Sequence, residues 1–321
     1  MKPIQSLLTS LVFLTGFFLS SPLTGQEART GKLRVLTTFL PVQAHASAIA
    51  GDDAIVEQLL GKDAGPHDFQ FSPSAVRKLA DADVLIINGA GIEDWMESLI
   101  QRTGKKDLVV VDTSKGVKLL KSPDVIAEGF DANGHGHSHA HSDEGENGMN
   151  PHTWLDPVIA QQQTKTILAA LQKADPANAK TYANRANDYL KELKALDANF
   201  RDTLSGLPNK NLVTFHDAFP YLANQYKLRY VGSISEFPEK DPTPQLLAAL
   251  VDQIKELKIG VLFAEEGYAP ELLKKIASQT GARVSQLDTL EVGTGTPTAY
   301  LDRMGKNLQA LKEAFQPPAA Q

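Results

Sequence analysis

"DPANAKTYANRANDYLKELKALDANFRDTLSGLP", residues 175–208, is one continuous helical run in the middle of the chain. A helix of about 30 residues is roughly 45 Å long, at about 1.5 Å per residue. On both sides of this run, short β-rich segments alternate with helical segments, a pattern typical of parallel-sheet α/β architecture. The sequence therefore predicts an α/β fold of two lobes, each with a four-stranded, mainly parallel sheet flanked by helices, joined by one long rigid helix.

The expected strands are short apolar runs bounded by turn residues: 33–38, 54–60, 83–89 and 107–112 before the long helix, and 211–216, 228–232, 259–265 and 282–288 after it. Helices are expected where a capping residue precedes a proline, as at Ser72, Asp156 and Thr243. We expect an N-terminal lobe over 29–174, the linking helix over 175–208 and a C-terminal lobe over 209–321.

The composition excludes several classes of protein. The 321 residues carry a formal net charge of −6, which argues against a nucleic-acid partner. The chain has no cysteine, so disulfides, thiolate metal sites and cysteine nucleophiles are excluded. Residues 1–28 combine Lys2, an apolar core and a small-residue exit, which predicts a cleaved signal peptide. We expect a periplasmic protein without a lipid anchor, since no cysteine is present to carry one.

Four polar residues follow predicted strands: His67 in "GPHDFQ", His152 in "NPHTWLDP", His216 in "TFHDAF" and Asp288 in "QLDTL". Ligands of open α/β sheets bind beyond the carboxyl ends of the strands, so these side chains can converge in a cleft between the lobes. Three imidazoles and one carboxylate suit Zn²⁺ better than they suit Mg²⁺ or Ca²⁺. The sequence predicts a four-ligand metal site.

Each of these residues also has an ordinary structural explanation. A histidine at a strand end is often a hydrogen-bonding loop residue, and Asp288 is as well suited to capping a turn. Glu265, Glu266 or a water molecule can complete the shell in its place. His45 lies on a predicted helix without metal-site context, and Asp156 and Asp217 are better explained as helix caps. The alternative for both aspartates is that they orient a nearby imidazole.

Residues 133–148 form a second histidine-containing segment in which histidines alternate with Gly, Ser and Ala. Such a segment lacks fixed geometry, and ordering it costs roughly 1 kcal/mol or more per residue. One interpretation is a solvated loop without function. Our hypothesis is a mobile, low-affinity metal collector formed by His135, His137, His139 and His141.

The segments around the predicted ligands resemble the solute-binding proteins of zinc and manganese ABC importers, most closely the zinc-specific members. "PHTWLDP" (151–157) and "FHDAFPYLA" (215–223) carry the resemblance most specifically, and it extends over about residues 31–316. It implies His67, His152, His216 and Asp288 as ligands. Manganese-type members tend to carry glutamate where this chain has His216. Some zinc-type members carry an acidic residue before the first histidine, where this chain has Pro66.

The resemblance implies a receptor that captures Zn²⁺ as transported ligand, uses no catalytic cofactor and delivers the ion to an ABC importer permease with its cytoplasmic ATPase. We expect a monomer that is not an enzyme. The alternatives are a zinc buffer or chaperone, a Mn²⁺-binding receptor and, third, an exported zinc hydrolase. No H-E-x-x-H pair supports the hydrolase.

Overall fold

The computed structural model describes residues 31–70, 72–121, 148–208, 210–234, 243–265 and 270–316. The chain from Lys32 onward folds as one compact unit. The predicted leader, the four histidines of the 133–148 segment and Glu266 lie outside the described residues.

The first sheet is built from the predicted strands before the long helix. Its strands pair in parallel in the order β2-β1-β3-β4. They are β1 (Leu33–Thr37), β2 (Ala54–Gln58), β3 (Val84–Ile87) and β4 (Val109–Asp112). The helices of this part are α1 (Leu40–Ala50), α2 (Pro73–Asp81) and α3 (Met96–Thr103).

The second sheet repeats the topology of the first, with parallel strands in the order β6-β5-β7-β8. Its strands are β5 (Asn211–Thr214), β6 (Arg229–Ser233), β7 (Val261–Glu265) and β8 (Arg283–Leu287). The accompanying helices are α6 (Pro220–Tyr226), α7 (Pro244–Glu256), α8 (Pro270–Thr280) and α9 (Ala299–Phe315). The predicted fold class, two four-stranded sheets flanked by helices, is confirmed.

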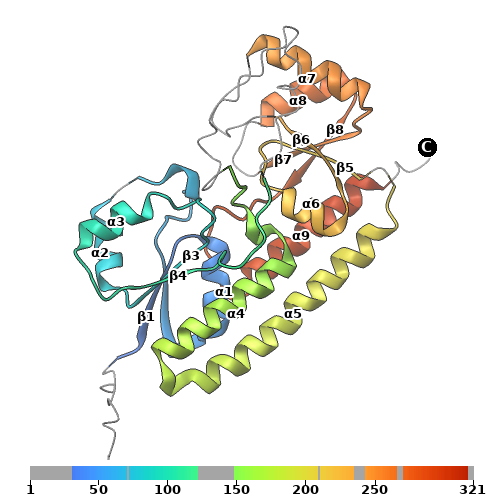
Figure 1. The fold of residues 1–321 in the computed structure, drawn as a ribbon. Coiled ribbons are helices and arrows are strands. Elements are labelled where there is room, and N and C mark those ends of the chain that lie inside the picture. The colour runs from blue at the N-terminus through green and yellow to red at the C-terminus, as the bar shows by residue number, and fades with distance from the viewer. Residues whose placement is uncertain are drawn as a thin grey trace, which may run out of the picture. The chain divides into compact units, whose positions relative to one another are not determined.

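Helices α4 (Pro157–Ala174) and α5 (Ala179–Ser205) lead from one sheet to the other and pack along each other (Figure 1). The Asp156 side chain caps α4 by accepting a hydrogen bond of 2.7 Å from the backbone N–H of Val158. The long helix begins later than the sequence pattern predicts, because Pro176–Asn178 form a 3₁₀ turn before α5. Helix α5 is nevertheless the predicted link between the lobes.

One face of α5 supplies the apolar contact that joins the two halves. Its buried residues recur every three or four positions, as a single helical stripe requires: Tyr182, Ala186, Tyr189, Leu193, Leu196, Phe200 and Leu204. These side chains belong to one continuous core that contains Val35 and Val84 of the first sheet and Leu212 and Phe263 of the second. The two sheets are therefore connected through packed side chains as well as through the chain.

Both sheets have a topological switch point between their two central strands, where the connections leave in opposite directions. In open α/β sheets, ligands bind beyond the carboxyl ends of the strands at such a point. In the second sheet this point lies between the ends of β5 and β7, so His216 and Glu265 are brought together there.

Candidate metal centre

His67 lies in a short 3₁₀ turn, Pro66–Asp68, that follows β2. Trp95, the residue before α3, holds this turn in place, because its indole N–H donates a hydrogen bond of 3.1 Å to the Pro66 carbonyl. Phe69 stacks on the Trp95 ring with 3.8 Å between ring centroids. An indole and a phenyl ring therefore fix the backbone on either side of His67.

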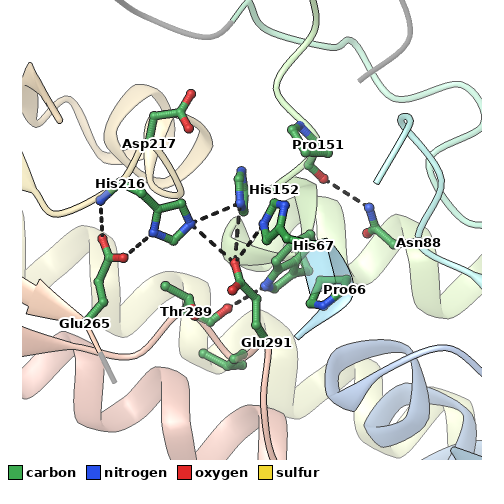
Figure 2. A network of polar contacts seen from close by, with 12 residues as sticks. Pro66, His67, Asn88, Pro151, His152, His216, Asp217, Glu265, Thr289 and Glu291 are labelled. Atoms are coloured by element: carbon green, nitrogen blue, oxygen red, sulfur yellow. Dashed lines mark hydrogen bonds and ion pairs between the residues drawn. The ribbon is translucent and has the colours of Figure 1, made fainter. Parts of the chain in front are cut away.

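His152 is buried in the segment that leads into α4. Asn150 orients it, since the amide oxygen accepts the backbone N–H of His152 at 3.0 Å and lies 3.1 Å from its ring Nδ1. The Asn88 amide donates to the Pro151 carbonyl at 3.0 Å, as Figure 2 shows, and its oxygen accepts the Thr153 hydroxyl at 3.1 Å. With Nδ1 held by an amide oxygen, Nε2 of His152 is the nitrogen presented to the site.

His216 follows β5, and Glu265 is the last residue of the neighbouring strand β7. The register pairs Thr214 with Phe263, which places His216 and Glu265 beside each other two residues later. One Glu265 oxygen accepts the backbone N–H of His216 at 3.1 Å, and the other contacts its ring Nδ1. The sheet thus turns Nε2 of His216 toward the other two histidines.

Glu291 supplies the fourth donor from a segment that crosses to the N-terminal half. The Trp154 indole N–H donates to the Thr289 carbonyl at 2.7 Å. Further along, the N–H of Gly293 donates to the Lys62 carbonyl at 2.6 Å, and that of Gly295 to the Gln43 amide oxygen at 2.5 Å. We call residues 289–295 the carboxylate strap, because these bonds hold Glu291 over the histidines.

The four donor atoms converge on one small volume (Figure 2). Glu291 Oε1 lies 3.4 Å from the Nε2 atoms of His152 and His216 and 3.6 Å from that of His67. The Nε2 atoms of His152 and His216 are 3.3 Å apart. Four ligands at about 2.0–2.1 Å from a tetrahedral zinc ion lie about 3.3–3.4 Å from one another. The distances from Glu291 to His152 and His216, and between these two histidines, therefore fit a tetrahedral ion, with His67 slightly further away.

The donors are almost completely removed from solvent, with 8% of the His67 side chain and 1% of the Glu291 side chain exposed. Neither carboxylate oxygen of Glu291 accepts a hydrogen bond from a described residue. Three imidazole nitrogens lie 3.4–3.6 Å from Oε1 of this buried carboxylate, close enough for electrostatic attraction but beyond ordinary hydrogen-bond length. A cation at the centre of the cluster would give the carboxylate a direct partner.

Burial and mutual charge determine the proton affinities in the cluster. Burial lowers the pKa of His152, although Glu291 partly offsets the effect. Burial by itself raises the pKa of Glu291, but the three imidazoles outweigh it and hold that pKa well below its usual range. Burial by itself lowers the pKa of His216, whereas the Glu265 carboxylate raises it well above the ordinary value. The negative charge therefore stays on Glu291, where a cation needs it.

The structure brings His67, His152 and His216 together but does not bring Asp288 to them. Asp288 follows β8 as expected, yet its two carboxylate oxygens are bound by the Arg303 guanidinium of α9. We therefore correct the fourth candidate ligand from Asp288 to Glu291, three residues further along the chain. Glu265, the alternative that the sequence left open, contacts His216 on the side of the ring that faces away from the cluster.

Glu291 was missed because it does not end a strand. The sequence feature that could have pointed to Glu291 is "LEVGTG" (290–295), in which two glycines follow this glutamate. A Cβ atom at Gly295 would lie 2.4 Å from the Leu40 carbonyl oxygen of α1, so only glycine permits this approach. Two glycines close together in sequence can indicate a segment that packs closely against another element. Here that element is α1, and the close packing positions the carboxylate of Glu291.

The helix caps at Asp156 and Asp217 have different outcomes. Asp156 caps α4, as predicted. The Asp217 carboxylate instead accepts a hydrogen bond of 2.9 Å from the Asn150 amide, the group that also orients His152. Asp217 thus lies next to one candidate ligand in sequence and supports the orienting group of another.

Residues 35–314 match the family described as ZnuA, zinc-uptake complex component A, periplasmic. The chain belongs to the ZnuA family. Among its relatives, the high-affinity zinc uptake system protein ZnuA of Bacillus subtilis is 33% identical over an alignment of 304 residues, and the match covers 92% of each chain. The predicted resemblance to zinc-type solute-binding proteins is confirmed.

A second relative of this ZnuA-family chain is the zinc-binding lipoprotein AdcA of Streptococcus pneumoniae, 32% identical over 321 residues. The match covers 98% of this chain and 61% of AdcA. The crystal structure of the Zn(II)-bound ZnuA-like domain of AdcA superposes with a TM-score of 0.73 at 30% identity, covering 89% of this chain and 100% of that domain.

The comparison contradicts the predicted localisation. We expected a periplasmic protein without a lipid anchor, yet AdcA is named a lipoprotein although it matches nearly the whole of this ZnuA-family chain. A lipoprotein therefore occurs among its relatives, and the expectation is withdrawn. Within the described ranges, no helix has both the length and the apolar character needed to cross a membrane.

Proposed function

We propose that the chain captures Zn²⁺ between His67, His152, His216 and Glu291 and delivers it to the membrane permease of an ABC importer, for high-affinity zinc uptake. Membership of a family described as a zinc-uptake component supports the transport role. The observation that carries the cargo assignment is the cluster itself, with three imidazole nitrogens around one carboxylate oxygen at 3.4–3.6 Å.

The donor set favours zinc among the common divalent cations. Imidazole nitrogen suits zinc, copper and nickel, whereas Mg²⁺ and Ca²⁺ prefer shells of oxygen. Zinc has no geometric preference of its own and accepts a tetrahedral shell of this composition. One carboxylate among three neutral imidazoles leaves a net charge of +1 on the loaded site. Burying a net charge of +1 costs less than burying the charge of +2 that four neutral ligands would leave.

Capture requires little rearrangement, since Asn150 and Glu265 already hold two of the rings toward the cluster. The ion exchanges its hydration shell for these donors, so binding displaces water and any proton on the imidazoles. Release requires that the shell be opened. The contacts that cross between the halves near the cluster, such as Trp154 to Thr289, are the bonds that docking to the permease would loosen.

We further propose that the receptor is a monomer and is not an enzyme. A catalytic zinc site keeps an open coordination position for water or substrate, whereas four protein donors fill a tetrahedral shell. The working division is an N-terminal lobe over 29–174, the linking helix over 175–208 and a C-terminal lobe over 209–321. The cluster draws ligands from both lobes.

The test is a competitive zinc titration of the purified chain against a chromophoric chelator, together with His152→Ala and Glu291→Ala. We expect one tight site in the parent and its loss in each variant, while circular dichroism shows the same fold. Glu313→Ala, at an exposed glutamate of α9, is the matched control and should keep the tight site. If both cluster variants bind one zinc as tightly as the parent, the cargo site lies elsewhere and the proposal fails.

A further inference from the structure

Two of the three imidazoles in the cluster are held from behind by different chemical groups. The ring Nδ1 of His152 faces the neutral amide oxygen of Asn150 at 3.1 Å. The ring Nδ1 of His216 faces the carboxylate of Glu265. The two histidines are otherwise alike, since both are buried and both aim Nε2 at the cluster.

Glu265 contacts His216 at two positions. One carboxylate oxygen accepts the backbone N–H at 3.1 Å and the other contacts the ring, as Figure 2 shows. Glu265 is itself 3% exposed and ends a central strand of the second sheet. Because the Glu265 carboxylate contacts both the backbone and the ring of His216, the ring has little freedom to rotate.

The contact with Glu265 determines which ring nitrogen of His216 carries the hydrogen. A carboxylate accepts a hydrogen bond, so the hydrogen of the ring stays on Nδ1 and Nε2 is left as the nitrogen for a metal ion. Partial withdrawal of the Nδ1 proton by a carboxylate also makes Nε2 a stronger electron donor. An amide oxygen, as at His152, orients the ring with a weaker effect of this kind.

We propose that Glu265 is a positioning residue for metal binding, which holds the His216 ring with Nε2 toward the ion and makes His216 the strongest imidazole donor of the site. This inference rests on the proposed function. Glu265 touches no metal ion in this scheme and acts only through His216. It departs from the sequence-based alternative, in which Glu265 was a competing ligand.

The test compares Glu265→Gln and Glu265→Ala with Asp63→Asn in the full chain. Glu265→Gln keeps a hydrogen-bonding group of the same size without the charge. Asp63→Asn removes one negative charge from an exposed position four residues before His67, away from the contacts that hold the three rings. It therefore controls for a general loss of negative charge near the cluster. Urea unfolding of each metal-free variant confirms the fold.

We expect the zinc dissociation constant of Glu265→Gln to rise about 10–100-fold, the range found for groups that support a metal ligand. Asp63→Asn should change it less than about threefold. In the zinc-loaded parent, the proton on Nδ1 of His216 should give a far-downfield NMR resonance because it is shared with a carboxylate. That resonance should move upfield in Glu265→Gln and remain in Asp63→Asn, which a purely structural role for Glu265 would not produce.

Two results would overturn the inference. The first is a folded Glu265→Gln variant with parent-like zinc affinity and an unmoved ring proton. The second is an equal loss of affinity in Glu265→Gln and Asp63→Asn, which would reduce the effect to net charge. If the parent chain itself lacks a tight site that requires His216, the proposed function has failed rather than this inference.

Discussion

The Asp288 carboxylate is bound by the Arg303 guanidinium, with 2.6 Å between Arg303 Nη2 and Asp288 Oδ1. The same guanidinium donates to the Val292 carbonyl at 2.6 Å. Asp288 therefore anchors the start of the carboxylate strap to α9, while Glu291, three residues later, faces the histidines. The two acidic residues have separate roles, and substitution can distinguish them.

Asp288→Asn should destabilise the fold and keep the metal site. A hydrogen bond to a charged group contributes about 1.5–3 kcal/mol, and both side chains are mostly buried, with 17% and 20% exposed. We expect the free energy of unfolding to fall by that amount in urea titrations. Glu291→Gln should leave unfolding nearly unchanged but weaken zinc binding by more than the roughly 100-fold that loss of a supporting group costs. The reverse pattern would reinstate Asp288 as the ligand.

Gly295→Ala should disturb the strap without removing any donor. The added Cβ would lie 2.4 Å from the Leu40 carbonyl oxygen and 2.6 Å from the Ala44 nitrogen, so the strap must move away from α1. Overpacking of this kind costs about 1–3 kcal/mol, and zinc affinity should fall as Glu291 shifts. Chemical denaturation and zinc titration measure the two effects.

Gly305→Ala is the matched control for that substitution. Gly305 lies within α9, and a Cβ there meets nothing within 4 Å. The change should stabilise the protein by about 0.5–1 kcal/mol, because alanine is the better helix former. Zinc affinity should be unchanged. Equal behaviour of the two glycine variants would show that the strap is not pressed against α1 as described.

His45→Gln should reduce the loss of unfolding free energy that occurs as the pH falls below about 6.5. Burial lowers the pKa of His45 to about 3, so the folded state keeps it neutral while the unfolded chain takes up a proton below about pH 6.5. The unfolded state then binds more protons, and stability falls as the pH falls from 6.5 toward 3. This one residue contributes up to about 1.4 kcal/mol per pH unit in that window.

The measurement is urea unfolding with a chelator present, at steps from pH 7.5 to 4.5. Glutamine leaves a polar partner for the Tyr189 hydroxyl, which lies 3.0 Å from His45 Nδ1. We expect the parent and variant curves to differ by a constant at pH 7–7.5 and to converge or cross at lower pH. Parallel curves throughout would show that His45 does not titrate between the folded and unfolded states.

Replacing His135, His137, His139 and His141 with serine should leave one tight zinc site and remove only weak ones. These residues lie outside the described residues, and the collector hypothesis rests on their sequence alone. Equilibrium dialysis should show a lower total zinc content at high zinc and an unchanged tight constant in chelator competition. Loss of the tight site in this variant would mean that the segment contributes ligands to it.

Local patterns were enough to predict most of the fold. The repeat of capping residue and proline located the starts of α2, α4 and α7 at Pro73, Pro157 and Pro244. Apolar runs located the strands, because parallel strands are buried on both faces. The start of α5 was predicted too early, since the pattern does not distinguish a 3₁₀ turn at Pro176 from the first turn of an α-helix.

The site was less predictable, because two of its features depend on tertiary contacts. Histidines are scarce enough that each one could be examined, and three of them lie in the cluster. His152, however, lies just before α4 and not at the end of a strand. Carboxylates are common, and the choice between Asp288 and Glu291 depends on Arg303, which lies on a helix 15 residues after Asp288. The role of Glu265 likewise depends on the register of β5 with β7.

The four donors at 67, 152, 216 and 291 are separated by 85, 64 and 75 positions in turn. Closing loops of such length in an unfolded chain is entropically costly, so the effective concentration of one donor near another stays low until the sheets have formed. Small zinc domains use metal to drive folding, whereas in this chain we expect folding to precede metal binding. Because Glu291 follows β8, a newly made chain should gain its full affinity only at the end of folding. Bound zinc would then report that the whole chain has folded.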